Sequence, residues 1–262
     1  MSRNAVNEAT KKLIDNSSYN ICSAENMGYG YQIWHFPRDS FAFSGMHGQY
    51  AIYHPTTDLA MVCNSGFRRG ELLPNVIFSS FFENIVDLAE KIPLPENIEE
   101  KKKLDDYCGK LQLIAASGKE QSGFEKNING RRFVADGENS MRITEFTLYF
   151  EENGGSFEYV NAQGKKTLLF GRRKNIFQQF PQTGYSKETG SVGCAGHKYD
   201  CAVSAAWKEE RKLQIFVQII DEYIGLLDIT IGFNDHYAVI DMKKDAEDFL
   251  TEYSGYANMV AE

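Results

Sequence analysis

The densest group of residues that could do chemistry lies late in the chain, in Cys194-Ala-Gly-His197-Lys-Tyr-Asp-Cys201. Two thiolates and an imidazole are ligands that Zn²⁺ takes, but a structural zinc site needs a fourth ligand and usually has more closely paired cysteines. The spacing leaves two alternatives, a metal site on Cys194, His197 and Cys201 or a glycine-rich loop that leads into a strand. We expect the loop, and no metal or other cofactor.

Motifs for nucleophilic or cofactor chemistry are absent from the sequence. A nucleophilic serine can be activated by a lysine one helical turn later, on the same helix face, yet no serine here has Lys three residues after it. The chain also contains no glycine-rich phosphate loop, no His-Glu-x-x-His and no Cys-x-x-Cys. We therefore expect no complete catalytic site within these residues.

Composition excludes several classes of protein. The net charge of −8 argues against a nucleic-acid-binding protein, because neutralising phosphates requires a surplus of Lys and Arg. No apolar run approaches the roughly 20 residues of a membrane span, and we see no signal-peptide pattern. The five cysteines are widely spaced and odd in number, which favours free thiols in a reducing compartment. As the sequence stands, we expect a cytoplasmic protein.

The first part of the chain predicts a small antiparallel meander with flanking helices. Aromatic and β-branched residues indicate strands, and apolar residues recurring every three to four positions indicate helices. The expected helices cover residues 4–16, 72–91 and part of 96–114, and the expected strands cover residues 28–36, 41–43, 49–53 and 59–63.

From residue 119 onward, alternating apolar residues and hairpin turns predict a run of strands. Phe146, Leu148 and Phe150 fall on one face of one strand, and Asn153-Gly154 is typical of a hairpin turn. Closely spaced strands of this kind favour an antiparallel barrel or sandwich of about eight to nine strands. The expected strands cover residues 131–135, 141–150, 155–160, 166–170, 175–180, 202–207, 213–220, 226–233 and 237–242.

The chain therefore has an α+β organisation in three parts. Residues 1–92 form a partial antiparallel sheet with helices, 93–118 form a linker with a charged helix, and 119–262 form the barrel-like domain.

Much of the sequence resembles serine hydrolases related to class C β-lactamases and penicillin-binding proteins. The first part of the resemblance lies in Tyr29-Gly-Tyr-Gln-Ile-Trp, Phe43-Ser-Gly-Met-His-Gly-Gln49 and Ile52-Tyr-His-Pro-Thr-Thr-Asp58, in an order similar to the end of that catalytic domain. The second part is similar to a β-rich accessory domain that follows some of these hydrolases; it lies in Ile143-Thr-Glu-Phe-Thr-Leu, Gly154-Gly155, Asn161-Ala-Gln-Gly164, Phe170-Gly171 and Ala205-Ala-Trp207.

The resemblance assigns the family's third active-site motif to Phe43, Ser44 and Gly45. It implies that the Ser44 hydroxyl contacts substrate, that Gly45 admits substrate close to the strand, and that the Met46 backbone N–H serves as an oxyanion donor. Phe43 departs from the motif because the family has a cation there. We expect His47 to be a loop residue outside catalysis.

The family's other motifs do not complete the site. Its second motif, Tyr-x-Asn, occurs at Tyr159-Val-Asn161 and Tyr256-Ala-Asn258, but both follow the third motif, which is the wrong order. We interpret both as chance matches.

From these observations we expect the C-terminal portion of a β-lactamase-related serine hydrolase, inactive alone because it lacks the Ser-x-x-Lys nucleophile. Its expected partner is the missing N-terminal part of the hydrolase, or a second copy, through the exposed sheet edge at residues 58–64. The alternative for this edge is that the N-terminal segment of the chain folds over it. The alternative function is a lipocalin-like module that binds a small apolar ligand inside the barrel, or an interaction module. Aromatic residues that simply fill the barrel are the simpler expectation for residues 119–262.

Overall fold

A computed structural model describes residues 2–18, 27–66, 73–89, 95–184, 197–221, 223–246 and 249–262. The chain divides into two compact units, Met1–Gly109 and Lys110–Glu262, and each is described by itself. No helix in these described ranges is both long enough and apolar enough to cross a membrane.

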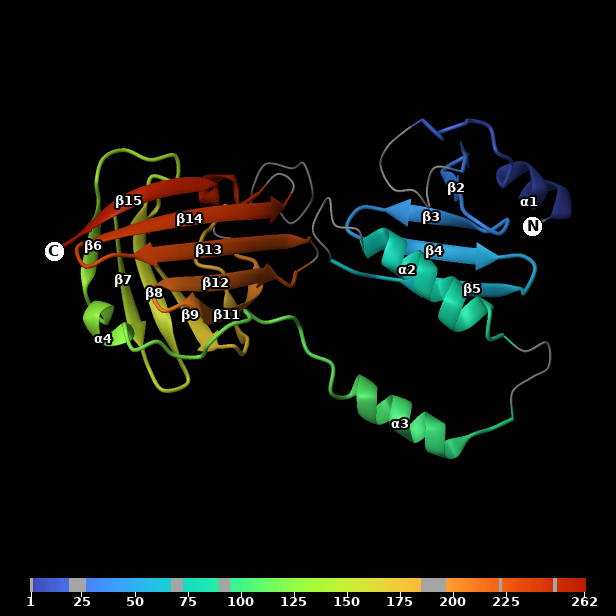
Figure 1. Cartoon of the computed structure of the whole chain (residues 1–262). Coiled ribbons are helices and arrows are strands. Elements are labelled where there is room, and N and C mark those ends of the chain that lie inside the picture. Colours follow the sequence, from blue (N-terminus) through green and yellow to red (C-terminus); the bar gives the residue numbers. More distant parts are fainter. Residues whose placement is uncertain are drawn as a thin grey trace. The chain divides into compact units, whose positions relative to one another are not determined.

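The first unit contains a five-stranded antiparallel sheet in the order β1-β2-β3-β4-β5 (Figure 1). The sheet and its flanking helices confirm the fold predicted for this part of the chain. The elements of the unit are α1 (Arg3–Ala9), β1 (Tyr29–Gly30), β2 (Ile33–His35), β3 (Phe41–Gly45), β4 (Gln49–His54), β5 (Leu59–Cys63), α2 (Leu73–Phe81), the π-helix η2 (Phe82–Val86) and α3 (Ile98–Cys108).

One expected strand is divided in two. Residues 28–36 were expected to run straight, but Tyr31 and Gln32 adopt positive φ of 43° and 68° and turn the chain between β1 and β2. Two consecutive residues in this region are typical of a tight hairpin turn, which side-chain type alone did not reveal because neither residue is glycine. The segment before β1 also joins the sheet, through a bridge between Ile14 and Tyr29.

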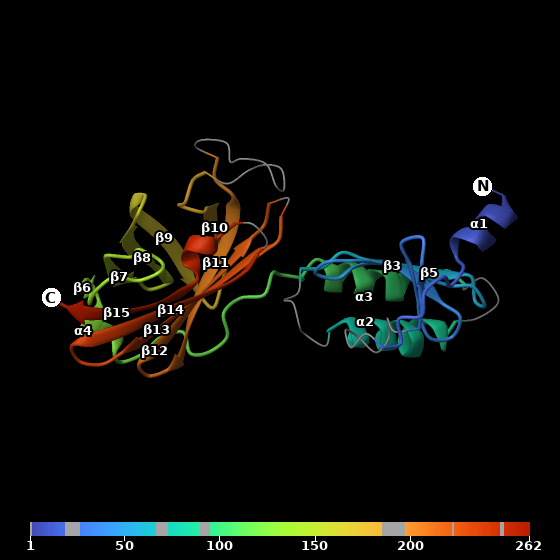
Figure 2. The same cartoon turned by 90° about the horizontal axis from the view of Figure 1, so that it is seen from above.

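A single layer of helix covers one face of this sheet. Alternate residues of β4, Tyr50 and Ile52, are buried against Phe78 and Phe81 of α2, with Phe82 from η2 beside them. Figure 2 shows α2 on one side of the strands. α3 contains no buried residue, and its side chains instead pair along the helix, as Lys101 does with Asp105 at 2.8 Å.

The second unit is a closed barrel of nine strands, with β10 as an additional strand at its edge. The barrel that the sequence predicted is therefore confirmed. The elements of the unit are α4 (Glu125–Ile128), β6 (Arg132–Ala135), β7 (Glu145–Phe150), β8 (Gly154–Asn161), β9 (Gly164–Arg172), β10 (Ile176–Gln179), β11 (Asp200–Glu209), β12 (Lys212–Ile219), β13 (Gly225–Phe233), β14 (Tyr237–Ala246), the 3₁₀ turn η3 (Thr251–Tyr253) and β15 (Gly255–Ala261).

The barrel is closed by two features that the sequence did not predict. β15, where the sequence predicted no strand, pairs with β14 on one side and β6 on the other. β9 pairs with β11 in parallel, through Ser204 with Gly171 and Ala205 with Arg172, so the barrel is mixed. Closure pairs the backbone N–H and C=O groups that the edge strands of an open sheet would leave without partners.

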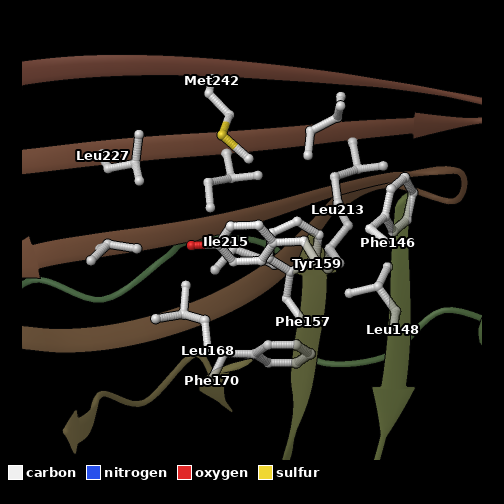
Figure 3. Packing of buried hydrophobic residues seen from close by; sticks show 14 of the residues in the cluster. Phe146, Leu148, Phe157, Tyr159, Leu168, Phe170, Leu213, Ile215, Leu227 and Met242 are labelled. Carbon is white, nitrogen blue, oxygen red and sulfur yellow. The ribbon is translucent and has the colours of Figure 1, made fainter. Parts of the chain in front are cut away.

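Aromatic side chains occupy the barrel interior. Figure 3 shows side chains of β7, β8 and β9 pointing toward those of β12, β13 and β14. Ring contacts run from Phe133 to Phe146 at 4.9 Å, on to Phe157 at 5.7 Å, and from Phe157 to Tyr159 at 4.9 Å. These contacts are those of rings that pack a core.

Residues 111–118, expected to belong to the linker, lie against the outside of the barrel wall. The Ala116 amide donates to the buried Ser204 hydroxyl at 2.8 Å, and Gln218 donates to the carbonyl of Ile114 at 2.6 Å. Gly118 approaches the wall so closely that a Cβ there would lie 2.4 Å from the carbonyl oxygen of Trp207. This segment is therefore held along its length by the second unit.

Candidate functional site

The candidate third motif lies at the end of the hairpin formed by β3 and β4. Gly45 pairs with Gln49, and Met46, His47 and Gly48 form the three-residue turn between them. His47 and Gly48 have φ of 58° and 88°, both in the left-handed region, which glycine adopts readily and other residues adopt rarely. A Cβ at Gly45 would lie 3.1 Å from the Gln49 Cβ, so the glycine allows this close pairing.

Ser65 is hydrogen-bonded to the Met46–Gly48 turn. Its hydroxyl lies 2.7 Å from the carbonyl oxygen of His47 and 3.1 Å from that of Gly48, so the two carbonyls share its single proton. The Gln49 side-chain amide donates to the Ser65 carbonyl. The Met46–Gly48 turn is therefore held in one conformation by a residue 16 or more positions away in the sequence. No motif pointed to Ser65, because the contact depends on the register of β4 and β5.

The register separates the residues of the third motif onto two faces of the sheet. Ser44 lies opposite Tyr50 and therefore on the face that α2 covers, whereas Phe43 lies opposite Ala51 on the other face. Phe43 is 55% exposed and Met46, in the turn, is 59% exposed. The expected substrate-contacting hydroxyl and the residue in the cation's position thus point in opposite directions.

The face that carries Phe43 is apolar and uncharged. The register aligns Phe43 with Ala51 and Val62 in one row, and Phe41 with Tyr53 and Ala60 in the next. Val62 is 72% exposed. None of the five strands contains Asp, Glu, Lys or Arg. We call Phe41, Phe43, Ala51, Tyr53, Ala60 and Val62 the open face, because none of them belongs to the core between the sheet and α2.

Two polar groups border the open face. The Tyr53 hydroxyl donates to Asp58 at 2.7 Å, and this bond raises the pKa of Tyr53. His35 lies opposite Phe41, and its Nε2 is buried with no hydrogen-bond partner in the described part of the chain. A buried nitrogen without a partner is costly, so this nitrogen is a place where an additional polar group would be favourable.

His47, expected to be a loop residue, lies in the turn and is 8% exposed. Its contacts with Ser65 run through its backbone carbonyl. It therefore contributes to the shape of the turn.

The candidate metal ligands are only partly within the described residues. Cys194 lies outside them, and His197 lies just before β11. The Cys201 side chain belongs to the barrel interior, is 0% exposed, and has its pKa raised by burial to about 12. No group of three metal-ligating side chains occurs among the residues that the structure describes.

Comparison of the chain with protein-family models found no match, and comparison with curated proteins found no significant match.

Proposed function

We propose that this chain forms the C-terminal portion of a β-lactamase-related serine hydrolase and does not hydrolyse substrate alone. In this proposal β3 and the Met46–Gly48 turn flank the substrate, and the nucleophile comes from residues outside the chain. The observation that carries the proposal is the open face, an apolar sheet surface that nothing in the core of the first unit covers.

A sheet with apolar residues on both faces buries them fully only when a further layer of structure covers each face. The covered face has one helical layer, α2 with η2, and the open face presents Phe43 and Val62 at 55% and 72% exposure. Large exposed apolar patches mark interaction sites. A nucleophile-bearing helical layer on the open face would bury these side chains, and it would meet β3 on the side of Phe43, the face opposite Ser44.

The edge strand β5 supports the same reading. Among the described residues β5 pairs with β4 alone. The described N-terminal residues, which were expected as one possible cover for this edge, instead pair at the opposite edge, through Ile14 and Tyr29. Natural edge strands are usually protected by charges, proline or bulges, yet β5 has no charged residue and no proline. A further strand of the hydrolase domain would cover this edge, whereas self-pairing of two copies is the competing outcome.

The lipocalin-like alternative is not favoured by a specific observation. The barrel interior is occupied by aromatic rings in mutual contact, from Phe133 through Phe157 to Tyr159. We therefore do not propose an apolar ligand inside it.

Enzyme assays test the first half of the proposal. The purified chain, incubated with a chromogenic cephalosporin and a p-nitrophenyl ester, is expected to give no turnover above background. Serine-dependent turnover by the chain alone would contradict us. The DNA upstream of Met1 is expected to continue in frame with Ser-x-x-Lys followed by Tyr-x-Asn, and the polypeptide it encodes is expected to restore turnover when co-expressed.

Neighbouring residues of β5 provide a matched test of the open face. Val62→Lys places a charge on the open face, and Met61→Lys places it on the face covered by α2. We expect V62K to fold as the parent does and to lose association with the nucleophile-bearing part, while M61K destabilises the first unit. Gel filtration of the chain alone identifies self-pairing, and a dimer that V62K leaves unchanged would point to the β5 edge instead.

A further inference from the structure

The end of the barrel opposite α4 gathers polar side chains from distant segments. Asn161, at the end of β8, donates to the Gln182 side-chain oxygen at 3.1 Å, and Tyr253 donates to the same oxygen at 3.0 Å. Gln163, in the β8–β9 turn, donates to the carbonyl of Thr183 at 2.9 Å. These bonds bring the turn beside the residues that follow β10.

Lys166 is turned toward the interior at this end. It lies directly opposite Tyr159, whose ring is buried in the core. It shares the inner face of β9 with Leu168 and Phe170, because residues two apart on a strand point to the same side. Its ammonium donates to the Gln163 side-chain oxygen at 3.1 Å. Burial lowers the pKa of Lys166, and the positive charge of Lys198 lowers it further.

Neither of these two lysines has an anionic partner in the described ranges. The ion pairs found there include neither Lys166 nor Lys198. The neighbouring Lys165, which faces outward, pairs with Glu158 at 2.7 Å. The inward lysine therefore lacks the counter-charge that the outward lysine has.

His197 adds a polar atom without a partner. Backbone bonds from Phe180 to Tyr199 and from Gly184 to His197 hold His197 beside the Gln182 segment. Its Nε2 is buried and has no hydrogen-bond partner among the residues that the structure covers. In the tautomer with a proton on Nε2, this atom is a hydrogen-bond donor without an acceptor among the described residues.

We propose that this end of the barrel binds a small oxyanion, a carboxylate or phosphate group, through Lys166, Lys198 and His197. Lys166 has a neutral acceptor in Gln163 but no counter-charge, and the buried Nε2 of His197 has no acceptor, so an oxyanion supplies what each of them lacks. Three carboxylates of the described residues act electrostatically near this end: Glu252 on Tyr253, Asp221 on Tyr199 and Asp200 on Cys201. The proposal does not depend on the hydrolase assignment, which concerns the first unit.

Thermal unfolding of the full chain tests the site. Sodium phosphate and sodium acetate are titrated separately at constant ionic strength, with chloride as the balancing anion, so that the two sources of oxyanion are distinguished. We expect a saturable rise in the melting temperature of the barrel with at least one of them. Lys166→Gln is expected to weaken the apparent affinity about tenfold, and the exposed Lys198→Gln to weaken it in the same direction.

Lys165→Gln is the matched control, because it removes the neighbouring charge from the outer face of the same strand. It is expected to leave the oxyanion affinity unchanged. The proposal is overturned if neither anion raises the melting temperature beyond chloride, or if K165Q weakens binding as much as K166Q. If K166Q does not fold, K198Q takes its place: the proposal is overturned if K165Q weakens binding as much as K198Q does.

Discussion

Glu125→Gln tests what holds α4 to the end of the barrel. The Glu125 carboxylate accepts two hydrogen bonds from the Arg172 guanidinium, at 2.7 and 2.8 Å, and a third from the Trp207 indole at 2.7 Å. The Glu125 and Arg172 side chains are 15% and 8% exposed. The substitution keeps the size of the side chain and removes its charge, so it leaves a buried guanidinium without its counter-ion.

The expected loss in the free energy of unfolding is about 3 kcal/mol, the lower end of the range for a buried ion pair that loses one partner. The lower end applies because Arg172 keeps two neutral acceptors, the backbone carbonyls of Glu120 at 2.6 Å and Glu151 at 2.9 Å. The control is Arg132→Gln, which breaks pairs with Glu145 and Glu262 while its own side chain is 51% exposed. Exposed pairs contribute about 0–1 kcal/mol, so the control is expected to change little.

Urea unfolding followed by tryptophan fluorescence measures this difference. The chain has two tryptophans, so a Trp34→Phe background leaves Trp207 as the only reporter, and the signal then comes from the barrel alone. A loss below about 1 kcal/mol for E125Q, no larger than that of R132Q, would refute the idea that this ion pair secures α4.

The stability difference between the parent and E125Q is also expected to depend on pH. Burial acts to raise the pKa of Glu125, but the hydrogen bonds from Arg172, Trp207 and Ser122 outweigh it and the pKa is lowered. A carboxyl whose folded pKa lies below its unfolded value stabilises the protein above the unfolded pKa, and this contribution is lost as pH falls through the folded pKa. The parent and E125Q are therefore expected to differ most near neutral pH and to converge in acid.

Two further predictions concern the barrel. Cys201, whose thiol pKa is raised to about 12, is expected to resist a disulfide reagent at pH 8 in the native chain while the exposed Cys108 reacts at once; rapid labelling of both would contradict this burial. A chain of residues 119–262 is expected to be about 3 kcal/mol less stable in urea than one of residues 110–262, because it loses the buried bond to the Ser204 hydroxyl and the packing around it; equal stability would show that residues 110–118 contribute nothing.

The barrel was predictable because its strands alternate. Buried and half-buried residues alternate along the whole length of β13, and the sequence shows the same period. β15 was missed because Gly255, Ala257 and Asn258 have little intrinsic preference for strands, and it is ordered by pairing with β14 and β6. The parallel contact between β9 and β11 depends on the curvature of the whole sheet, which no local pattern contains.

The polar sites were less predictable, because their members are far apart in the sequence. The Ser65 hydroxyl reaches the His47 carbonyl across 18 positions, and Glu125 meets Arg172 across 47. Lys165 and Lys166 are adjacent and chemically identical, yet one pairs with Glu158 outside the barrel and the other faces the interior. Only the register of β9 separates them, and a shift of one residue would exchange their roles.

The same register explains the match to the family's second motif at Tyr159-Val-Asn161. Residues two apart on a strand share a face, and on β8 that face is the barrel interior, where Tyr159 and Asn161 are 2% and 8% exposed. A buried phenol and a buried amide must find partners, and they do: the Tyr159 hydroxyl lies 2.7 Å from that of Tyr253, and Asn161 donates to Gln182. This spacing follows from the hydrogen-bonding needs of the barrel interior, so the match adds no support to the hydrolase assignment, for which the open face of the first unit is the structural support.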